Sequence, residues 1–253
     1  MVMFMAAATT TRYKRWPRNP RFPELITRLV KICLLALLIG PAPGLAQESL
    51  ELKDGWTIQY FLALPGEESS RQSPWPLAVF MGGGSGNAPI SYEVYRFYAR
   101  ELASLGWAVA VPVSPDNRSF RGANVDRVRE LVSVLQARED VAQGKTLLAG
   151  ISAGGMSALE IARRYPEEIL AVMAVPALVR NAFNLKALAG MPVYLRIGSD
   201  DELGWGMQFE ETVEALTEVG VKLDAQLLYG EPHMFGLDWD RVSDWLSTLP
   251  ATP

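Results

Sequence analysis

Residues 145–162 read KTLLAGISAGGMSALEIA: an apolar run, a glycine-rich turn and an amphipathic run in succession. The apolar run Lys145–Ala149 is typical of a buried parallel strand, and Ala153–Arg164 predicts a helix. Between them, Gly150-Ile151-Ser152-Ala153-Gly154 matches G-x-S-x-G, in which small residues permit a sharp strand-to-helix turn. Such a turn places the Ser152 hydroxyl at a helix N-terminus, where free N–H groups favour negative charge. The alternative is that Ser152 only caps the helix.

Short apolar runs alternate with amphipathic stretches from about residue 48 onward, which indicates an α/β fold with a mostly parallel sheet and helices on both faces. The predicted strands are Trp56–Leu62, Leu77–Met81, Trp107–Pro112, Lys145–Ala149, Ile169–Val175, Val193–Ile197 and Lys222–Leu228. The predicted helices are Tyr92–Leu105, Val125–Ala142, Ala153–Arg164, Phe209–Val219 and Trp239–Leu249. Only about 17 residues separate Val175 from Val193, so we expect no cap domain there.

The first 46 residues differ in charge from the rest of the chain. They contain seven basic residues and one acid, a charge of +6, so residues 47–253 carry −10 within a total of −4. Arg28 and Lys31 precede the apolar run Ile32–Gly40, and Gly44-Leu45-Ala46 ends in small residues. This pattern predicts a signal peptide over residues 1–46, cut after Ala46, and hence export to the periplasm or the medium. The run is short for a bilayer span, so an uncleaved anchor is the second interpretation and we expect no stable membrane span after cleavage.

Composition excludes several kinds of site in the predicted domain, residues 47–253. Its acidic charge argues against nucleic acid as a partner. The only cysteine, Cys33, lies in the signal region, so the domain has neither a thiol nucleophile nor a Cys/His zinc cluster. With a single histidine, a His-based metal site is not expected either. We expect no metal and no organic cofactor.

His233 is that single histidine, so a serine nucleophile would have to use it as its base. It follows the last predicted strand, Lys222–Leu228. An acid must orient the imidazole, and three candidates follow the strand Val193–Ile197. These candidates are Asp200, Asp201 and Glu202.

A second glycine-rich stretch, Gly82-Gly83-Gly84-Ser85-Gly86, follows the predicted strand Leu77–Met81. Glycines let the backbone approach a reacting carbonyl closely, so this stretch predicts one donor of an oxyanion hole, with Ala153 as the other. The first donor is Gly83 or, alternatively, Gly82. A phosphate-binding loop is the rival interpretation, but the Lys-Ser/Thr ending is missing, and a dinucleotide fingerprint would need glycine at Asn87.

Residues ~50–250 resemble the α/β-hydrolase superfamily. The turn Gly150–Gly155 is similar to its nucleophile elbow, and the glycine stretch resembles its His-Gly-Gly-Gly motif with Met81 in place of histidine. Gly198-Ser199-Asp200-Asp201 is similar to the family's Gly-x-x-Asp, which favours Asp201 as the acid. The chain order Ser152, Asp201, His233 also matches the family's order. Among subgroups, the compact size and the elbow resemble small carboxylesterases, dienelactone-hydrolase-like proteins and polyester depolymerases.

The resemblance implies an exported serine hydrolase that cleaves carboxylic esters through Ser152, Asp201 and His233 and an acyl-enzyme. Its substrate would be a small-molecule or polymeric ester. Trp205 and Met207 follow the acidic loop and are predicted to form an apolar wall of the substrate site, or else the buried side of the next helix. A peptidase or acyltransferase with the same triad is the alternative, followed by a non-catalytic exported binding protein of this fold. The oligomeric state stays open.

Overall fold

The computed structural model describes residues 47–250 apart from 67–68, 70 and 180–184. The predicted signal peptide, residues 1–46, therefore lies outside the described residues. Within the described part, no helix has both the length and the apolar composition needed to cross a bilayer.

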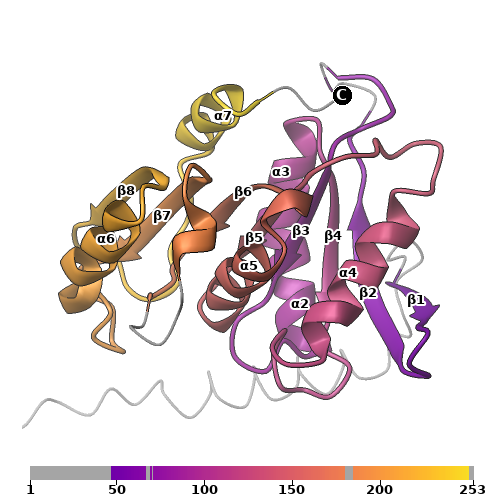
Figure 1. The fold of residues 1–253 in the computed structure, drawn as a ribbon, viewed down its shortest axis with the longest axis horizontal. Helices are drawn as coiled ribbons and strands as arrows, with labels where there is room; N and C mark the ends of the chain where they lie inside the picture. The colour runs from indigo at the N-terminus through magenta and orange to yellow at the C-terminus, as the bar shows by residue number, and fades with distance from the viewer. Residues whose placement is uncertain (1–46, 67–68, 70, 180–184, 251–253) are drawn as a thin grey trace, which may run out of the picture. The chain divides into compact units, whose positions relative to one another are not determined.

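An eight-stranded sheet forms the centre of the fold, in the order β1-β2-β4-β3-β5-β6-β7-β8 (Figure 1). All neighbours from β4 to β8 pair in parallel, whereas β1–β2 and β2–β4 are antiparallel. Strands β3 to β6 consist entirely of buried residues, which explains their continuous apolar runs. The strands are β1 (Gln47–Glu51), β2 (Thr57–Ala63), β3 (Leu77–Met81), β4 (Ala108–Val113), β5 (Thr146–Gly150), β6 (Ile169–Ala174), β7 (Pro192–Gly198) and β8 (Lys222–Leu228).

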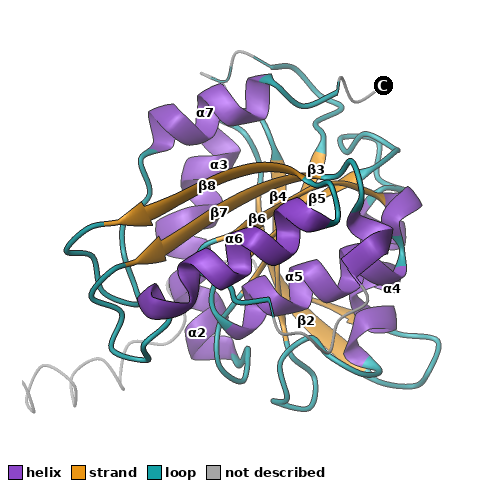
Figure 2. Ribbon diagram, turned by 60° about the vertical axis from the view of Figure 1, so that its left-hand side comes forward, coloured by secondary structure: helices purple, strands orange, loops and turns teal. Residues whose placement is uncertain are grey.

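Helices cover both faces of the sheet, as predicted. The α-helices are α2 (Ala88–Val94), α3 (Arg100–Ser104), α4 (Asn124–Leu135), α5 (Ala153–Arg164), α6 (Phe209–Glu218) and α7 (Trp239–Ser247). The π-helical turn η1 (Tyr95–Ala99) joins α2 to α3, and η2 (Pro166–Glu168), η3 (Leu185–Leu188) and η4 (Gly206–Gln208) are short 3₁₀ turns. Figure 2 shows α4, α5 and α6 on one face and α2, α3 and α7 on the other.

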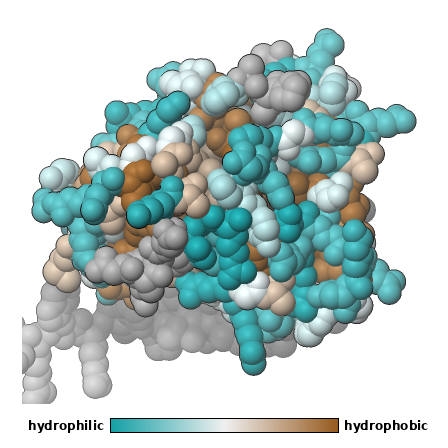
Figure 3. All heavy atoms as spheres, viewed as in Figure 1, coloured by the Kyte–Doolittle hydropathy of each residue, from teal (hydrophilic) through white to brown (hydrophobic). Residues whose placement is uncertain are grey.

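Each face has its own apolar core, because successive side chains of a strand point to opposite faces. In β3, Val79 packs with the core under α4, α5 and α6, whereas Phe80 packs with the core under α2, α3 and α7. The outer sides of α4 and α5 are mostly hydrophilic (Figure 3), as expected for amphipathic helices packed on a sheet.

Apart from shifts of one or two residues at element ends, three elements differ from the sequence predictions. The helix predicted over Tyr92–Leu105 begins earlier, at Ala88, and contains the π-helical turn η1. Strand β1 was not predicted, because its alternating exposed residues lie at the sheet edge and carry little apolar signal. The helix predicted over Val125–Ala142 ends at Leu135, because the following residues turn back to pair with Trp75. Trp75 donates its N–H to the Asp140 carbonyl oxygen (3.0 Å) and accepts from the Ala142 N–H (2.8 Å).

Candidate active site

The carboxyl ends of β3, β5, β7 and β8 lie at one edge of the sheet, because these strands run parallel. The loops that leave this edge carry the glycine stretch, Ser152, Asp201 and His233. Open α/β sheets bind ligands at this edge.

Ser152 occupies a strained turn between the end of β5 and the first residue of α5. Its φ of 56° and ψ of −119° lie where residues other than glycine are rarely found. Two hydrogen bonds hold the turn: Ser152 N–H to the Pro176 carbonyl (2.8 Å) and Ile151 N–H to the Met81 carbonyl (3.1 Å). The surrounding strands therefore maintain the conformation that the serine would not adopt by itself.

Two glycines of the G-x-S-x-G motif leave no room for a side chain. A Cβ at Gly154 would lie 2.2 Å from the Met81 carbonyl oxygen, and one at Gly150 would lie 2.3 Å from the carbonyl carbon of Gly154. The start of α5 therefore packs directly against the end of β3. This contact brings the glycine stretch after β3 alongside Ser152.

Asp201 and His233 form a buried pair. His233 Nδ1 lies 2.7 Å from Asp201 Oδ2, and the two residues are 7% and 6% exposed. The other carboxylate oxygen of Asp201 accepts from the Leu203 N–H (2.7 Å), which fixes the carboxylate plane. Asp200 is exposed and accepts from the hydroxyl of Ser199 instead (2.8 Å). Of the three candidate acids, Asp201 therefore contacts the imidazole ring.

Glu202 holds the backbone of the same histidine, a contact that the sequence patterns did not reveal. Its carboxylate accepts from the His233 N–H (3.0 Å), and this hydrogen bond lowers the pKa of Glu202 below its ordinary value. The two loops are joined further by Asp200 N–H to the Glu231 carbonyl oxygen (3.0 Å). A Cβ at Gly198 would lie 2.2 Å from that same oxygen, so the loops are in direct backbone contact.

Trp205 packs edge-on against the His233 ring, with ring centroids 4.8 Å apart and an interplanar angle of 88°. It is 8% exposed, whereas Met207 is 87% exposed. Neither residue lines the cavity beside Ser152. Trp205 thus covers one side of the imidazole, and the predicted role of the two residues in binding substrate stays a prediction.

The glycine stretch lies against the turn that contains Ser152. A Cβ at Gly83 would lie 3.3 Å from Ser152 Cβ and 3.2 Å from the Ile151 carbonyl oxygen. Within the described part of the chain, the N–H groups of Gly83 and Ala153 donate no hydrogen bond. Ser152, in contrast, donates its own N–H to Pro176. Gly83 and Ala153 therefore keep free N–H donors close to Ser152.

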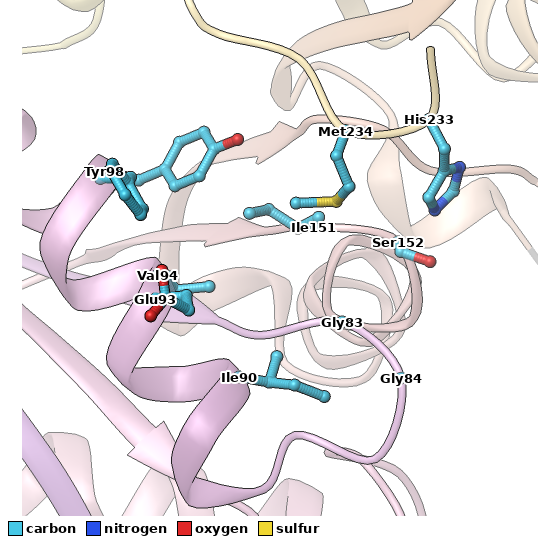
Figure 4. Close-up of a pocket in the computed structure, with 11 residues that line it drawn as sticks. Gly83, Gly84, Ile90, Glu93, Val94, Tyr98, Ile151, Ser152, His233 and Met234 are labelled. Atoms are coloured by element: carbon cyan, nitrogen blue, oxygen red, sulfur yellow. The ribbon is translucent and has the colours of Figure 1, made fainter. Parts of the chain in front are cut away.

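A cavity of about 490 Å³ opens beside Ser152 (Figure 4). Ser152 and His233 lie at one end, and the helical segment α2–η1 forms the opposite wall (Figure 4). The lining residues are Gly83, Gly84, Ile90, Glu93, Val94, Phe97, Tyr98, Ile151, Ser152, His233 and Met234. The cavity is therefore largely apolar, with Ser152 and His233 at one end and, among the described residues, a single carboxylate in the wall.

Comparison with known proteins places these features in a family. Residues 106–252 match the Esterase family, whereas no curated protein matches the chain in sequence. Several solved structures share the fold at low sequence identity. A lidless α/β serine hydrolase from Xanthomonas campestris superposes with a TM-score of 0.61 and 19% identity, over 84% of this chain and 98% of that one.

Two other structures give similar values. A dienelactone hydrolase from Anabaena variabilis superposes with a TM-score of 0.60 and 16% identity, over 82% of this chain and 98% of that one. A thermostable esterase gives 0.60 and 17%, over 81% of this chain, and the chain spans only 59% of its length. The family match covers more than half of the chain, and the sheet order and helical layers agree with these folds. The chain belongs to the Esterase family and has the α/β-hydrolase fold, with no cap domain in the part of the chain that the structure describes.

Proposed function

We propose that this protein hydrolyses carboxylic esters with Ser152 as nucleophile, His233 as general base and Asp201 as the residue that orients the imidazole. The buried contact of 2.7 Å between Asp201 and His233 carries the proposal. It occupies Nδ1 of the only histidine, so Nε2 remains to act on the serine. Figure 4 shows that the imidazole and Ser152 lie at the same end of the cavity.

The first half-reaction acylates the serine. His233 Nε2 takes the proton of Ser152 Oγ as Oγ bonds to the ester carbonyl carbon, and the carbonyl oxygen becomes an oxyanion. The free N–H groups of Gly83 and Ala153 stabilise that charge. The bond from carbon to the alkoxy oxygen then breaks, and His233 returns its proton to the leaving alcohol.

The second half-reaction repeats these steps with water. His233 removes a proton from water, the hydroxide oxygen bonds to the acyl carbon, and the bond to Ser152 Oγ breaks. The proton held by His233 returns to Ser152, and the carboxylic acid product leaves. The side chains end in the states in which they began.

A fluorophosphonate probe tests the nucleophile. The wild-type protein should be labelled and should hydrolyse p-nitrophenyl esters, and Ser152→Ala should lose both properties. Ser133→Ala, which removes an exposed hydroxyl on α4, is the matched control and should keep them. Labelling that persists in Ser152→Ala would show that another residue reacts.

A matched anilide series separates an esterase from a peptidase, because we expect esters and not anilides to turn over.

Export is a separate proposal, supported by the sequence of residues 1–46 alone. The mature chain is proposed to begin at Gln47 in the periplasm or the medium. Expression of the full chain in a secreting host, followed by N-terminal sequencing of the exported protein, tests it. Exported material that begins well before Gln47 contradicts cleavage after Ala46.

A further inference from the structure

Among the residues that the structure describes, Glu93 is the only carboxylate that lines the cavity beside Ser152. It lies in the α2 wall, whose other cavity-lining side chains are Ile90 and Val94. Figure 4 shows Glu93 at the level of Val94, between Ile90 and Tyr98. A substrate arm that fills the cavity therefore passes this carboxylate.

The charge of Glu93 is not neutralised by a neighbouring cation. Among the described residues, Glu93 forms no salt bridge and accepts no side-chain hydrogen bond. Arg96 lies three residues further along but stacks on the rings of Tyr92 (5.7 Å) and Phe97 (5.1 Å). The Tyr98 hydroxyl donates to the Phe235 carbonyl oxygen (2.8 Å) and is not available to Glu93 either.

In the described part of the chain, no hydrogen bond or salt bridge explains why this wall carries a carboxylate. Glu93 is exposed toward the cavity side of a short helix whose buried residues are Ser91 and Val94. The rest of the domain adds to its negative potential, since residues 47–253 carry a net charge of −10. The Phe97 ring in the same wall already carries the Arg96 guanidinium, so the carboxylate of Glu93 and not this ring would attract a cationic arm.

We propose that Glu93 makes the cavity selective by charge, so that it accepts an ester arm that is apolar and neutral or cationic and rejects one that ends in a carboxylate. The proposal rests on the proposed ester hydrolysis. Two like charges a few ångströms apart in a half-enclosed cavity repel strongly enough to change binding about tenfold or more. A trimethylammonium group, in contrast, is attracted by the carboxylate.

Three matched p-nitrophenyl esters test the proposal. Their acyl chains have equal length and end in methyl, carboxylate or trimethylammonium. For the wild type, kcat/KM should be at least about tenfold higher for the neutral ester than for the anionic one. Glu93→Gln keeps the side-chain shape and should narrow that ratio to about twofold. The wild type should also have a higher kcat/KM for the cationic ester than for the neutral one, and Glu93→Gln should lose this advantage.

The same three end groups are also placed on the alcohol arm of acetate esters, because either arm can enter the cavity. A narrowed ratio in either series supports the proposal. Glu101→Gln removes the same charge from an exposed position on α3, outside the cavity lining, and should leave all ratios unchanged.

Two outcomes overturn the proposal. One is that Glu93→Gln leaves the ratio of kcat/KM between the neutral and the anionic ester unchanged in both series. The other is that Glu101→Gln narrows this ratio as much as Glu93→Gln does, because the selectivity would then come from the net charge of the protein. Failure of the ester-hydrolysis proposal looks different. It would appear as absent turnover of the neutral ester, or as turnover that survives Ser152→Ala.

Discussion

The two sides of Ser152 are built in opposite ways. On the β7–β8 side, Asp201 and His233 are buried and fastened by hydrogen bonds between the two loops that carry them. On the α2–η1 side, the cavity wall is apolar apart from Glu93 and is open, with Phe97 56% exposed. Side chains on the β7–β8 side therefore have little freedom to move, whereas those in the α2–η1 wall have much.

This difference assigns separate tasks to the two sides. A general base must be held within a few tenths of an ångström of its working position, which requires a rigid, hydrogen-bonded setting. A substrate arm needs only a cavity of fitting size and polarity. Substitutions on the β7–β8 side should therefore lower kcat, whereas substitutions in the α2–η1 wall should change which ester is preferred.

The largest effect is expected at the acid. Asp201→Asn keeps the shape of the side chain but no longer holds the imidazole as an N–H donor, so kcat should fall about a thousandfold or more. Asp200→Asn changes an adjacent, exposed carboxylate and should lower kcat less than about tenfold. Steady-state kinetics on one neutral ester, with circular dichroism to verify folding, compares the two variants. The reverse ranking would move the orienting role to Asp200.

The next effect is expected at the glycine stretch after β3, which is proposed to supply one donor of the oxyanion hole. In Gly83→Ala the new methyl group would lie 3.2 Å from the Ile151 carbonyl oxygen, so the loop must shift and its N–H donor with it. Loss of one donor should lower kcat about a hundredfold. Gly66→Ala places a methyl group where no atom lies within 4 Å and serves as the matched control. An unchanged kcat in Gly83→Ala would mean that the donor is a different N–H group.

Trp205 tests the difference between the two sides most directly. The sequence predicts that it binds substrate, whereas in the structure it packs against the imidazole and does not line the cavity. As a positioning residue, Trp205→Ala should lower kcat about tenfold at nearly constant KM. As part of the substrate wall, it should raise KM instead. Met207→Ala is the comparison, since its exposed side chain should leave both constants unchanged.

The sequence predicts the core of the fold because buried parallel strands leave a plain apolar signal. Among the fully buried strands, β3 matches its predicted range and β5 differs by one residue at each end. The edge strand β8 also matches its range, although none of its residues is buried. The edge strand β1 was missed because its polar, half-exposed residues have no such signal. The end of α4 was missed because it depends on the pairing of Trp75 with residues 140–142, which are distant in sequence.

The candidate site likewise contains some features that the sequence predicts and others that it does not. The G-x-S-x-G turn and the single histidine are visible in the sequence, and the structure brings their loops to one edge of the sheet. The wall formed by Ile90, Glu93 and Tyr98 carries no motif and was not predicted. One signal was present: the helix that contains it directly follows the glycine stretch, so its inner side had to flank the site.

The smallest effect is expected at Glu202, whose bond to the His233 N–H ties the histidine loop to the acidic loop. This bond lowers the pKa of Glu202 below 4.5, its ordinary value. The folded state therefore gains stability from the carboxylate above about pH 4.5 and loses it as the pH falls through the lower, folded-state pKa. The glutamine side chain of Glu202→Gln does not titrate, so the melting temperature of this variant should fall less than that of the wild type between pH 5 and pH 3, values chosen on either side of about 4.5.

Glu231→Gln is the matched control, because it changes an exposed side chain on the same histidine loop. It should retain the wild-type loss of melting temperature on acidification. Thermal melts of the wild type, Glu202→Gln and Glu231→Gln at both pH values test whether the Glu202 carboxylate stabilises the fold. If Glu202→Gln loses as much as the wild type, Glu202 adds nothing to the rigidity of this side. The Asp201–His233 pair and the direct backbone contact at Gly198 would then be sufficient to hold the histidine loop in place.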